Sequence, residues 1–452
     1  MNRYATLLFA ALLATPALAA DFPRGQLIEK VTCAENPQES YALYLPSGYT
    51  PERAWPILYI LDPRSRGQVA AERFRAGAEK YGYILASSYS TMSDGPMEPN
   101  LKAMRALWVD THSRFQLDPR RAYAAGFSGT VRSACVLARA APGPLAGLVG
   151  AGAGFPFQQP PKKGDPFVFF GTLGDKDFNY YEMMDLEPQL VESGLPHRIE
   201  IFDGAHAWPP EDLASRALGW MELQAMKSGI RGKDPKIVED LWGQVTGLAR
   251  AAEASGDLFQ AHRHWSGAAA DFAGLRDVSD AAAKAAELAA NPALQRDRAA
   301  RQERLRRDKE YLEKAPGILS AATTPSGTPV TVAQIVAALK IHEWRKRAES
   351  ADRDEKLSAQ RVLNTVGVQT GYYLPNMFTE RKQHDRAVFV LSIAAEITPD
   401  SPLVFYNRAA AHARNGDRKK ALADLRKAVE NGWKDGAAIE KEEAFAGLRG
   451  EA

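Results

Sequence analysis

The sequence predicts an α/β fold followed by an all-α domain, and two observations carry that prediction. Over residues 21–231, short apolar runs alternate with helical patterns and with turns that contain Gly or Pro. From residue 235 onward the chain is rich in Ala, Glu and Arg and keeps a helical periodicity. Apolar strands that alternate with helices indicate a mostly parallel sheet with helices on both faces. The stretch 229–236, GIRGKDPK, is the expected linker between an α/β domain at 20–231 and a helical domain at 235–452.

The first residues, MNRYATLLFAALLATPALAA, predict a signal peptide over 1–19. Arg3 precedes an apolar run at 4–13, and the small residues Ala17 and Ala19 are spaced for cleavage by signal peptidase. The run is much shorter than the roughly 18 residues that a membrane-spanning helix needs. We therefore expect a periplasmic or secreted protein without a membrane span. An uncleaved N-terminal anchor is the alternative.

Apolar runs bounded by turn residues mark the expected strands of the first domain. Amphipathic patterns between several of them mark helices that cross from one strand to the next. The expected strands lie at 41–45, 57–61, 83–86, 122–126, 148–151, 167–171 and 199–202, and the expected helices at 70–81, 100–115 and 130–140.

The second half carries a recurring spacing of small residues that is typical of helical hairpins. Such segments resemble tetratricopeptide repeats, in which small residues let two antiparallel helices approach closely. In the middle copy Lys382 stands at the position of the turn glycine and Pro375 lies on the first helix, so we expect that copy to be irregular. The three copies are Ala249, Gly256, Ala261, Trp265 and Ala268; Ala387, Leu391, Ala394 and Pro399; and Phe405, Ala409, Gly416, Ala421, Leu425 and Ala428.

The composition is that of a globular protein of two or three domains, at 452 residues and 45% hydrophobic content. The 57 Lys and Arg nearly balance the 55 Asp and Glu, so we expect no nucleic-acid partner, because such a partner usually requires a basic excess. The run 296–314 mixes arginines with acidic residues and is an expected solvent-exposed helix. Two cysteines, Cys33 and Cys135, exclude a disulfide framework but leave one disulfide open.

The candidate nucleophile is Ser128, in the segment RAYAAGFSGTVR at 121–132. A β-like run ends at GFSGT and an amphipathic helix follows. A serine on a tight strand-to-helix turn has a strained backbone and needs small neighbours, which Gly126 and Gly129 supply. Thr130 stands where the pattern G-x-S-x-G has its last glycine, so an ordinary helix N-cap remains the alternative for this serine.

An acid and a histidine follow the serine, each on a turn after a predicted strand. The strand at 167–171 is followed by TLGDKDFNY, which offers Asp177 as the first choice for the acid and Asp175 as the alternative. The last strand is followed by DGAHAWPP, which offers His206 as the general base. Spacing alone does not separate the two aspartates.

Residues 41 to about 226 resemble the α/β-hydrolase superfamily, in particular secreted esterases of the polyhydroxybutyrate-depolymerase, feruloyl-esterase and dienelactone-hydrolase kind. The resemblance rests on YALYLPSGY, WPILYILDPRSRG, GFSGT, GDKDFNYYEM and FDGAHAWPP, and on the order serine, acid, histidine. It covers somewhat less than half of the chain. It implies Ser128 as nucleophile, His206 as base and Asp177 as the acid that orients the imidazole.

The resemblance also implies acyl transfer through an acyl-enzyme, without a metal or an organic cofactor. The oxyanion would bind the amide of Gly129 and one amide from the turn after the strand at 57–61, where Pro63 has no N–H and Arg64, or else Ser65, is the candidate. The expected substrate is a small-molecule ester, and the repeats would bind a protein partner or pack over the mouth of the site. Two alternatives remain open: a weakly active or inactive hydrolase-fold platform whose repeats bind protein, and a serine peptidase acting on short peptides.

Overall fold

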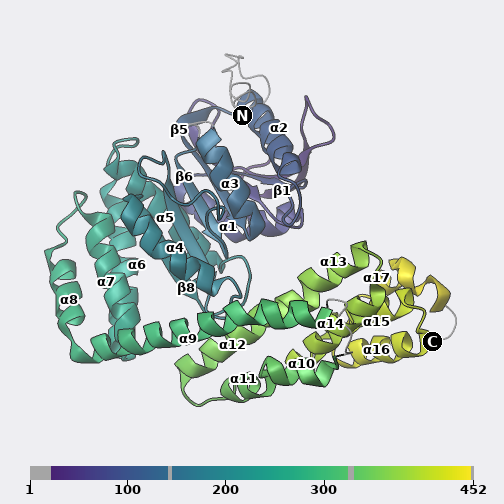
Figure 1. The fold of residues 1–452 in the computed structure, drawn as a ribbon. Helices are drawn as coiled ribbons and strands as arrows, with labels where there is room; N and C mark the ends of the chain where they lie inside the picture. The colour runs from purple at the N-terminus through teal and green to yellow at the C-terminus, as the bar shows by residue number, and fades with distance from the viewer. Residues whose placement is uncertain (1–21, 141–144, 324–329, 449–452) are drawn as a thin grey trace. The chain divides into compact units, whose positions relative to one another are not determined.

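A computed structural model describes residues 22–140, 145–323 and 330–448 of the chain (Figure 1). They form two compact units that divide between Ala299 and Ala300. The predicted signal peptide lies outside the described residues.

The first unit is built on an eight-stranded sheet with the order β1-β2-β4-β3-β5-β6-β7-β8. The pairs from β4 to β8 are parallel, whereas β2 pairs antiparallel with both β1 and β4. Each predicted strand overlaps an observed one, and β1 was not predicted. The strands are β1 (Leu27–Thr32), β2 (Ser40–Tyr44), β3 (Trp55–Leu61), β4 (Ile84–Ser88), β5 (Leu117–Phe127), β6 (Gly147–Ala151), β7 (Val168–Gly174) and β8 (His197–Phe202).

Helices cover both faces of this sheet, as Figure 1 shows. Along β3, Tyr59 and Leu61 pack on one face with side chains of α2, α3 and α4, while Leu58 and Ile60 pack on the other with α1 and α5. This alternation follows from the two-residue period of a strand. The predicted α/β fold class, a mostly parallel sheet with helices on both faces, is confirmed. The helices are α1 (Gly67–Tyr81), α2 (Glu98–Arg114), α3 (Gly129–Ala140), α4 (Tyr180–Ser193) and α5 (Glu211–Lys227).

Three complete helices beyond the predicted linker also belong to the first unit, and the first two are α6 (Pro235–Ala254) and α7 (Leu258–Phe272). Leu241 and Phe272 are buried in the same apolar cluster as the side chains of α1 and α5. Arg198 of β8 donates from Nε to Asp271 of α7 at 2.8 Å. The compact unit therefore runs past the predicted linker at 229–236, because these helices complete the core on one face of the sheet. Helix α8 (Ser279–Ala290) packs on α7.

The second unit is entirely helical in its described residues, which confirms the predicted all-α character of the C-terminal part. Helix α9 begins in the first unit and ends in the second. The elements are α9 (Pro292–Thr323), α10 (Val332–Ala338), α11 (Ile341–Arg347), α12 (Arg353–Val368), the π-helix η1 (Gln369–Tyr373), α13 (Leu374–Glu380), α14 (His384–Ile397), α15 (Pro402–Arg414), α16 (Arg418–Glu430), α17 (Gly436–Lys441) and the 3₁₀ helix η2 (Glu443–Leu448).

The three predicted helical hairpins are present as α6–α7, α13–α14 and α15–α16. Their turn residues Gly256, Lys382 and Gly416 all have a positive φ, of 78°, 58° and 81°. The middle hairpin is irregular as expected. The π-helix η1 runs directly into α13, and Pro375 is the second residue of α13. The resemblance to tetratricopeptide repeats stays a prediction.

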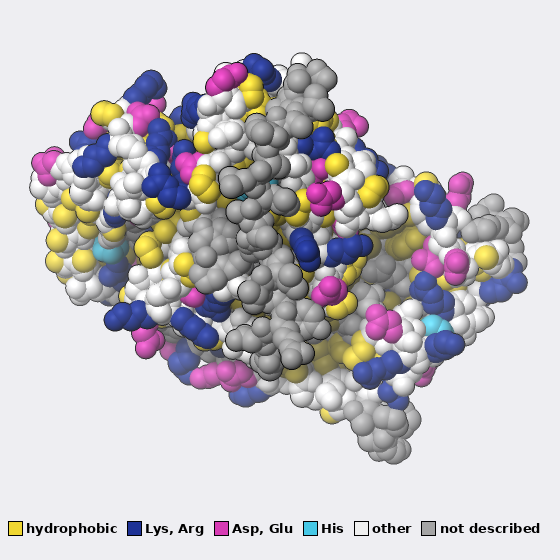
Figure 2. All heavy atoms as spheres, turned by 90° about the horizontal axis from the view of Figure 1, so that it is seen from above, with side chains coloured by type: hydrophobic (Ala, Val, Ile, Leu, Met, Phe, Trp, Pro, Cys, Tyr) yellow, Lys and Arg dark blue, Asp and Glu magenta, His cyan; other side chains and the backbone are white. Residues whose placement is uncertain are grey.

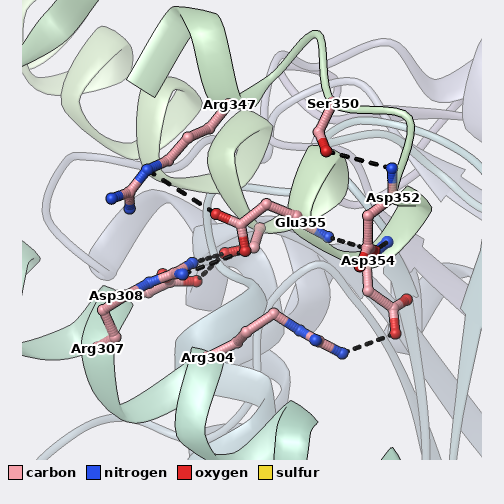
Figure 3. A network of polar contacts seen from close by, with 9 residues as sticks. Arg304, Arg307, Asp308, Arg347, Ser350, Asp352, Asp354 and Glu355 are labelled. Carbon is pink, nitrogen blue, oxygen red and sulfur yellow. Dashed lines mark hydrogen bonds and ion pairs between the residues drawn. The ribbon is translucent and has the colours of Figure 1, made fainter. Parts of the chain in front are cut away.

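The expectation of a solvent-exposed helix at 296–314 is wrong for one face of α9. Arg304 pairs with Asp354 of α12 at 2.8 Å, and Arg307 pairs with Glu355 at 3.1 Å (Figure 3). Asp308 is almost completely buried and accepts a hydrogen bond of 2.6 Å from Ser358 Oγ. The mixed charges of this run therefore bind a neighbouring helix as well as water.

The surface of the described residues carries both kinds of charge. Figure 2 shows Lys and Arg interspersed with Asp and Glu on the face that it presents. Among the described helices, none combines the length and apolar character needed to cross a membrane. Cys33 and Cys135 are both buried and free, so the disulfide left open by the sequence is not formed.

Candidate active site

Ser128 lies on the sharp turn between β5 and α3, called the nucleophile turn below (residues 126–130). Its φ of 55° falls in the left-handed region that non-glycine residues rarely adopt. Its amide donates to the carbonyl oxygen of Ala151 at 2.8 Å, which holds the turn against β6. Gly126 is required, because a Cβ there would lie 2.7 Å from the amide nitrogen of Val131. The predicted strand-to-helix turn is confirmed.

The hydroxyl group of Thr130 forms hydrogen bonds within the nucleophile turn and to the end of β3. The fully buried Oγ1 accepts a hydrogen bond from the amide of Phe127 at 3.0 Å. The same hydroxyl lies 2.6 Å from the carbonyl oxygen of Leu61, the nearer of two acceptors. Where the pattern has a glycine, Thr130 therefore adds a hydroxyl group that hydrogen-bonds the turn to the end of β3.

His206 and Asp177 meet at the carboxyl edge of the sheet. His206 Nδ1 is 2.9 Å from both carboxylate oxygens of Asp177, whose side chain is fully buried. Asp177 also accepts from the amide of Asn179 at 2.8 Å, which fixes the carboxylate. The imidazole ring packs against the rings of Phe127 and Phe178, at centroid distances of 4.6 and 4.2 Å. The histidine is therefore held by a carboxylate at Nδ1 and by two aromatic neighbours.

The structure separates the two aspartates that the sequence left open. Asp175 accepts a hydrogen bond from the amide of Gly204 at 3.1 Å. Gly204 lies in the loop between β8 and α5 (residues 203–210), which carries His206 and is called the histidine loop below. Asp177 contacts the imidazole itself. Asp175 thus shapes the histidine loop, and Asp177 has the position of an orienting acid.

Gly152, which the sequence reasoning missed, makes room for the pair of Asp177 and His206. A Cβ at this residue would lie 2.9 Å from an Oδ of Asp177 and from Nδ1 of His206. Its φ of 62° also favours glycine. Its carbonyl oxygen accepts from Asn179 Nδ2 at 2.7 Å. The available signal was the glycine-rich end of a strand, in the segment VGAGAGF.

The amide of Arg64, which the sequence predicts as an oxyanion donor, has a partner within its own loop. The amide of Arg64 already donates to Asp62 Oδ1 at 2.8 Å. The amide of the alternative, Ser65, donates to the carbonyl oxygens of Asp62 and Thr91. Both predicted donors are therefore hydrogen-bonded within or beside the loop after β3. Gly129 keeps the predicted position at the first turn of α3, where amides have no partner within the helix.

Asp62 is a buried carboxylate beside the site that the sequence reasoning also missed. It follows β3, and its side chain is fully buried. Burial favours its protonated form, but hydrogen bonds from Arg66, Trp208 and two backbone amides outweigh burial and hold the pKa of this carboxyl below its usual value. It is therefore a fixed negative charge at the carboxyl edge of the sheet.

A second charged pair joins the two helices that flank the site. Arg132 of α3 donates from Nη2 to both carboxylate oxygens of Glu182 of α4, at 2.8 and 2.7 Å. Burial raises the pKa of Glu182, and the attraction of Arg132 opposes that shift. The guanidinium also lies 5.2 Å from the centre of the exposed ring of Phe157.

No protein-family model matches this chain, and no curated protein matches its sequence. Several solved structures are similar to part of it. S-formylglutathione hydrolase (FrmB) from Staphylococcus aureus is 16% identical, with a TM-score of 0.34 over 44% of this chain and 98% of that one. A ferulic acid esterase is 15% identical, with a TM-score of 0.33 over 40% and 91%. Esterase 2 of Thermogutta terrifontis is 12% identical, with a TM-score of 0.35 over 47% and 98%. Likeness at this level assigns no activity to the chain.

Proposed function

We propose that this chain is a serine hydrolase that cleaves carboxylic esters through an acyl-enzyme. Ser128 is the nucleophile, His206 the general base and Asp177 the acid that orients the imidazole. One observation carries the proposal: a serine on a strained strand-to-helix turn shares a sheet edge with a histidine whose Nδ1 lies 2.9 Å from a buried aspartate.

The chemistry follows from the contact between this histidine and this aspartate. A carboxylate at Nδ1 favours the tautomer whose Nε2 is free to accept a proton. His206 takes the proton of Ser128 as the hydroxyl attacks the ester carbonyl, and it returns that proton to the leaving alcohol. Water then attacks the acyl-enzyme with the same base, which releases the acid and restores the serine.

The amide of Gly129 and the amino end of α3 stabilise the oxyanion of each tetrahedral intermediate. The second donor is open, because the amides of Arg64 and Ser65 are hydrogen-bonded to other acceptors. The reaction uses protons and an acyl group alone, so it calls for no metal or organic cofactor.

The wider setting of this function is also a proposal. The enzyme acts in the periplasm or outside the cell on a small-molecule ester, since its first 19 residues have the pattern of a signal peptide. The helical hairpins of the second unit bind a protein partner.

The test compares the full chain with Ser128→Ala on short-chain nitrophenyl esters and on peptide anilides. We expect ester turnover that falls by on the order of 10³ or more in the variant, with thermal unfolding nearly unchanged. Turnover that survives in Ser128→Ala excludes this serine. Cleavage of the anilides in preference to the esters would instead support the peptidase alternative.

One observation favours the inactive-platform alternative. The Arg64 and Ser65 amides, which the sequence predicts as oxyanion donors, are already hydrogen-bonded. A folded wild-type chain that turns over none of these substrates, and captures a protein partner through residues 300–452 alone, would favour that reading.

A further inference from the structure

Asp62 binds five N–H groups although its side chain is fully buried. The amides of Arg64 and Arg66 donate to Oδ1 at 2.8 and 3.2 Å. The Arg66 guanidinium donates from Nε at 3.1 Å and from Nη2 at 3.0 Å. The fifth donor is the indole Nε1 of Trp208, at 2.9 Å from Oδ2. Four of these donors belong to the loop after β3, and the fifth belongs to the histidine loop.

Trp208 lies two residues beyond His206 and is almost completely buried. Its ring packs against Phe127 at a centroid distance of 5.5 Å. Phe127 immediately precedes Ser128, and its own ring lies 4.6 Å from the imidazole of His206. The indole of Trp208 therefore touches the nucleophile turn with one side while its N–H is bound to Asp62.

The loop after β3 is in turn joined to the nucleophile turn. Thr130 Oγ1 lies 2.6 Å from the carbonyl oxygen of Leu61, the residue before Asp62. Thr91 Oγ1 donates to the backbone oxygen of Asp62 at 2.9 Å, which fixes that backbone from another side. Asp62 is thus anchored to the same turn that its partner Trp208 packs against.

We propose that Asp62 and Trp208 are positioning residues that set the distance between His206 and Ser128. This inference rests on the proposed function. The hydrogen bond between them crosses from the loop after β3 to the loop after β8, and a hydrogen bond to a buried carboxylate is among the stronger ones in proteins. Without the hydrogen bond between Trp208 and Asp62, His206 keeps its contact with Asp177, but the histidine loop is no longer held to the loop after β3. The imidazole is then less well oriented toward Ser128.

The test removes this one hydrogen bond in the full chain and uses a matched control. Trp208→Phe deletes the indole N–H and keeps an aromatic ring against Phe127. Trp220→Phe, on α5, is the control, because its indole N–H has no hydrogen-bond partner among the described residues although the side chain is similarly buried. We expect Trp208→Phe to lower kcat for the best ester about 10-fold to 100-fold, with KM changed by less than about 3-fold. Trp220→Phe should leave kcat unchanged.

A second variant tests whether the two residues act through each other. Asp62→Asn removes the charge that receives the indole N–H. If the hydrogen bond is the cause, the double variant Asp62→Asn/Trp208→Phe loses no more kcat than the more affected single variant. Losses that multiply would show independent effects and overturn the inference.

A third readout does not depend on turnover. The proton on Nδ1 of His206 gives a downfield proton resonance when it is held against Asp177, and Asp177→Asn identifies the signal by removing it. We expect Trp208→Phe to broaden this signal through faster exchange with water, while Trp220→Phe keeps it sharp. A sharp signal in Trp208→Phe contradicts the positioning role, whether or not the wild-type chain hydrolyses esters. Absence of turnover in the wild-type chain, with the broadening present, contradicts the proposed function alone.

Discussion

Asp177 and Asp175 lie two residues apart and have different partners, which gives a matched pair of substitutions. Asp177→Asn leaves the shape of the side chain but removes the charge at His206 Nδ1, so we expect ester turnover to fall by on the order of 10³ or more. Asp175→Asn keeps an oxygen for the amide of Gly204 and should lower turnover far less. Initial rates for both variants test this ranking, and the reverse order would reassign the acid.

Asp62 gives the protein a pH dependence at the acid end. Its pKa in the folded chain lies below the ordinary value of 3.8. A group of this kind adds stability above its unfolded pKa, and that contribution is lost as the pH falls below 3.8 and through the folded pKa. We therefore expect the difference in free energy of unfolding between wild type and Asp62→Asn to be larger at pH 6 than at pH 3. Urea unfolding at the two pH values measures it, and a constant difference would contradict the assignment.

Single residues differ in how far the sequence reveals them. Ser128 and His206 stand in local patterns, because a strained turn and a post-strand loop each leave marks on neighbouring residues. Asp62 and Trp208 are separated by 146 positions, and no local pattern joins them. The hydrogen bond from the Arg64 amide to Asp62 joins residues two positions apart, but the sequence does not show that the Asp62 side chain turns back onto its own loop.

At the scale of elements, the docking of α7 on β8 depends on a glycine. A Cβ at Gly267 would overlap the guanidinium of Arg198, which pairs with Asp271 one turn further along α7. We expect Gly267→Ala to destabilise the protein although alanine is the better helix former. The control is Gly247→Ala on α6, where the new Cβ meets no described atom within 4 Å apart from its chain neighbours and the backbone of its own helix. That change should stabilise by about 0.5–1 kcal/mol. Opposite signs in urea unfolding support the docking, and equal gains in stability would refute it.

Elements were predictable where one strong pattern decides them. The strands from β2 to β8 carry apolar runs because most are buried on both faces. Strand β1, with the sequence LIEKVT, lies at the sheet edge and is partly exposed, so it has no such run. The exposed character expected of α9 was wrong on one face, because a charge pattern does not show whether water or a second helix supplies the opposite charges.

At the scale of the whole molecule, the first compact unit includes helices that the sequence assigned to the second domain. A chain that ends at residue 231 would expose the apolar side chains of α5 that pack against Leu241 and Phe272. We expect this shorter chain to aggregate and a chain that ends at residue 299 to be soluble, with cooperative thermal unfolding. A soluble, cooperatively folded chain of residues 22–231 would restore the boundary predicted from the linker.

The composition of residues 229–236 predicts a linker, because Gly, Lys and Pro interrupt the helical pattern there. Composition does not show that a helical hairpin beyond such a break returns to the sheet. That return depends on contacts between residues far apart in sequence, such as Arg198 with Asp271. The fold class was therefore predictable and the extent of the compact unit was not.

The central claim is that Ser128 is an activated nucleophile, and its most direct test is labelling of the full chain with a fluorophosphonate probe. Intact mass would give the stoichiometry and peptide mapping the modified residue. We predict one label per chain, on Ser128, and none in His206→Ala, because the base that activates the serine is then missing. No label on a demonstrably folded chain, or a label on another residue, would contradict the account.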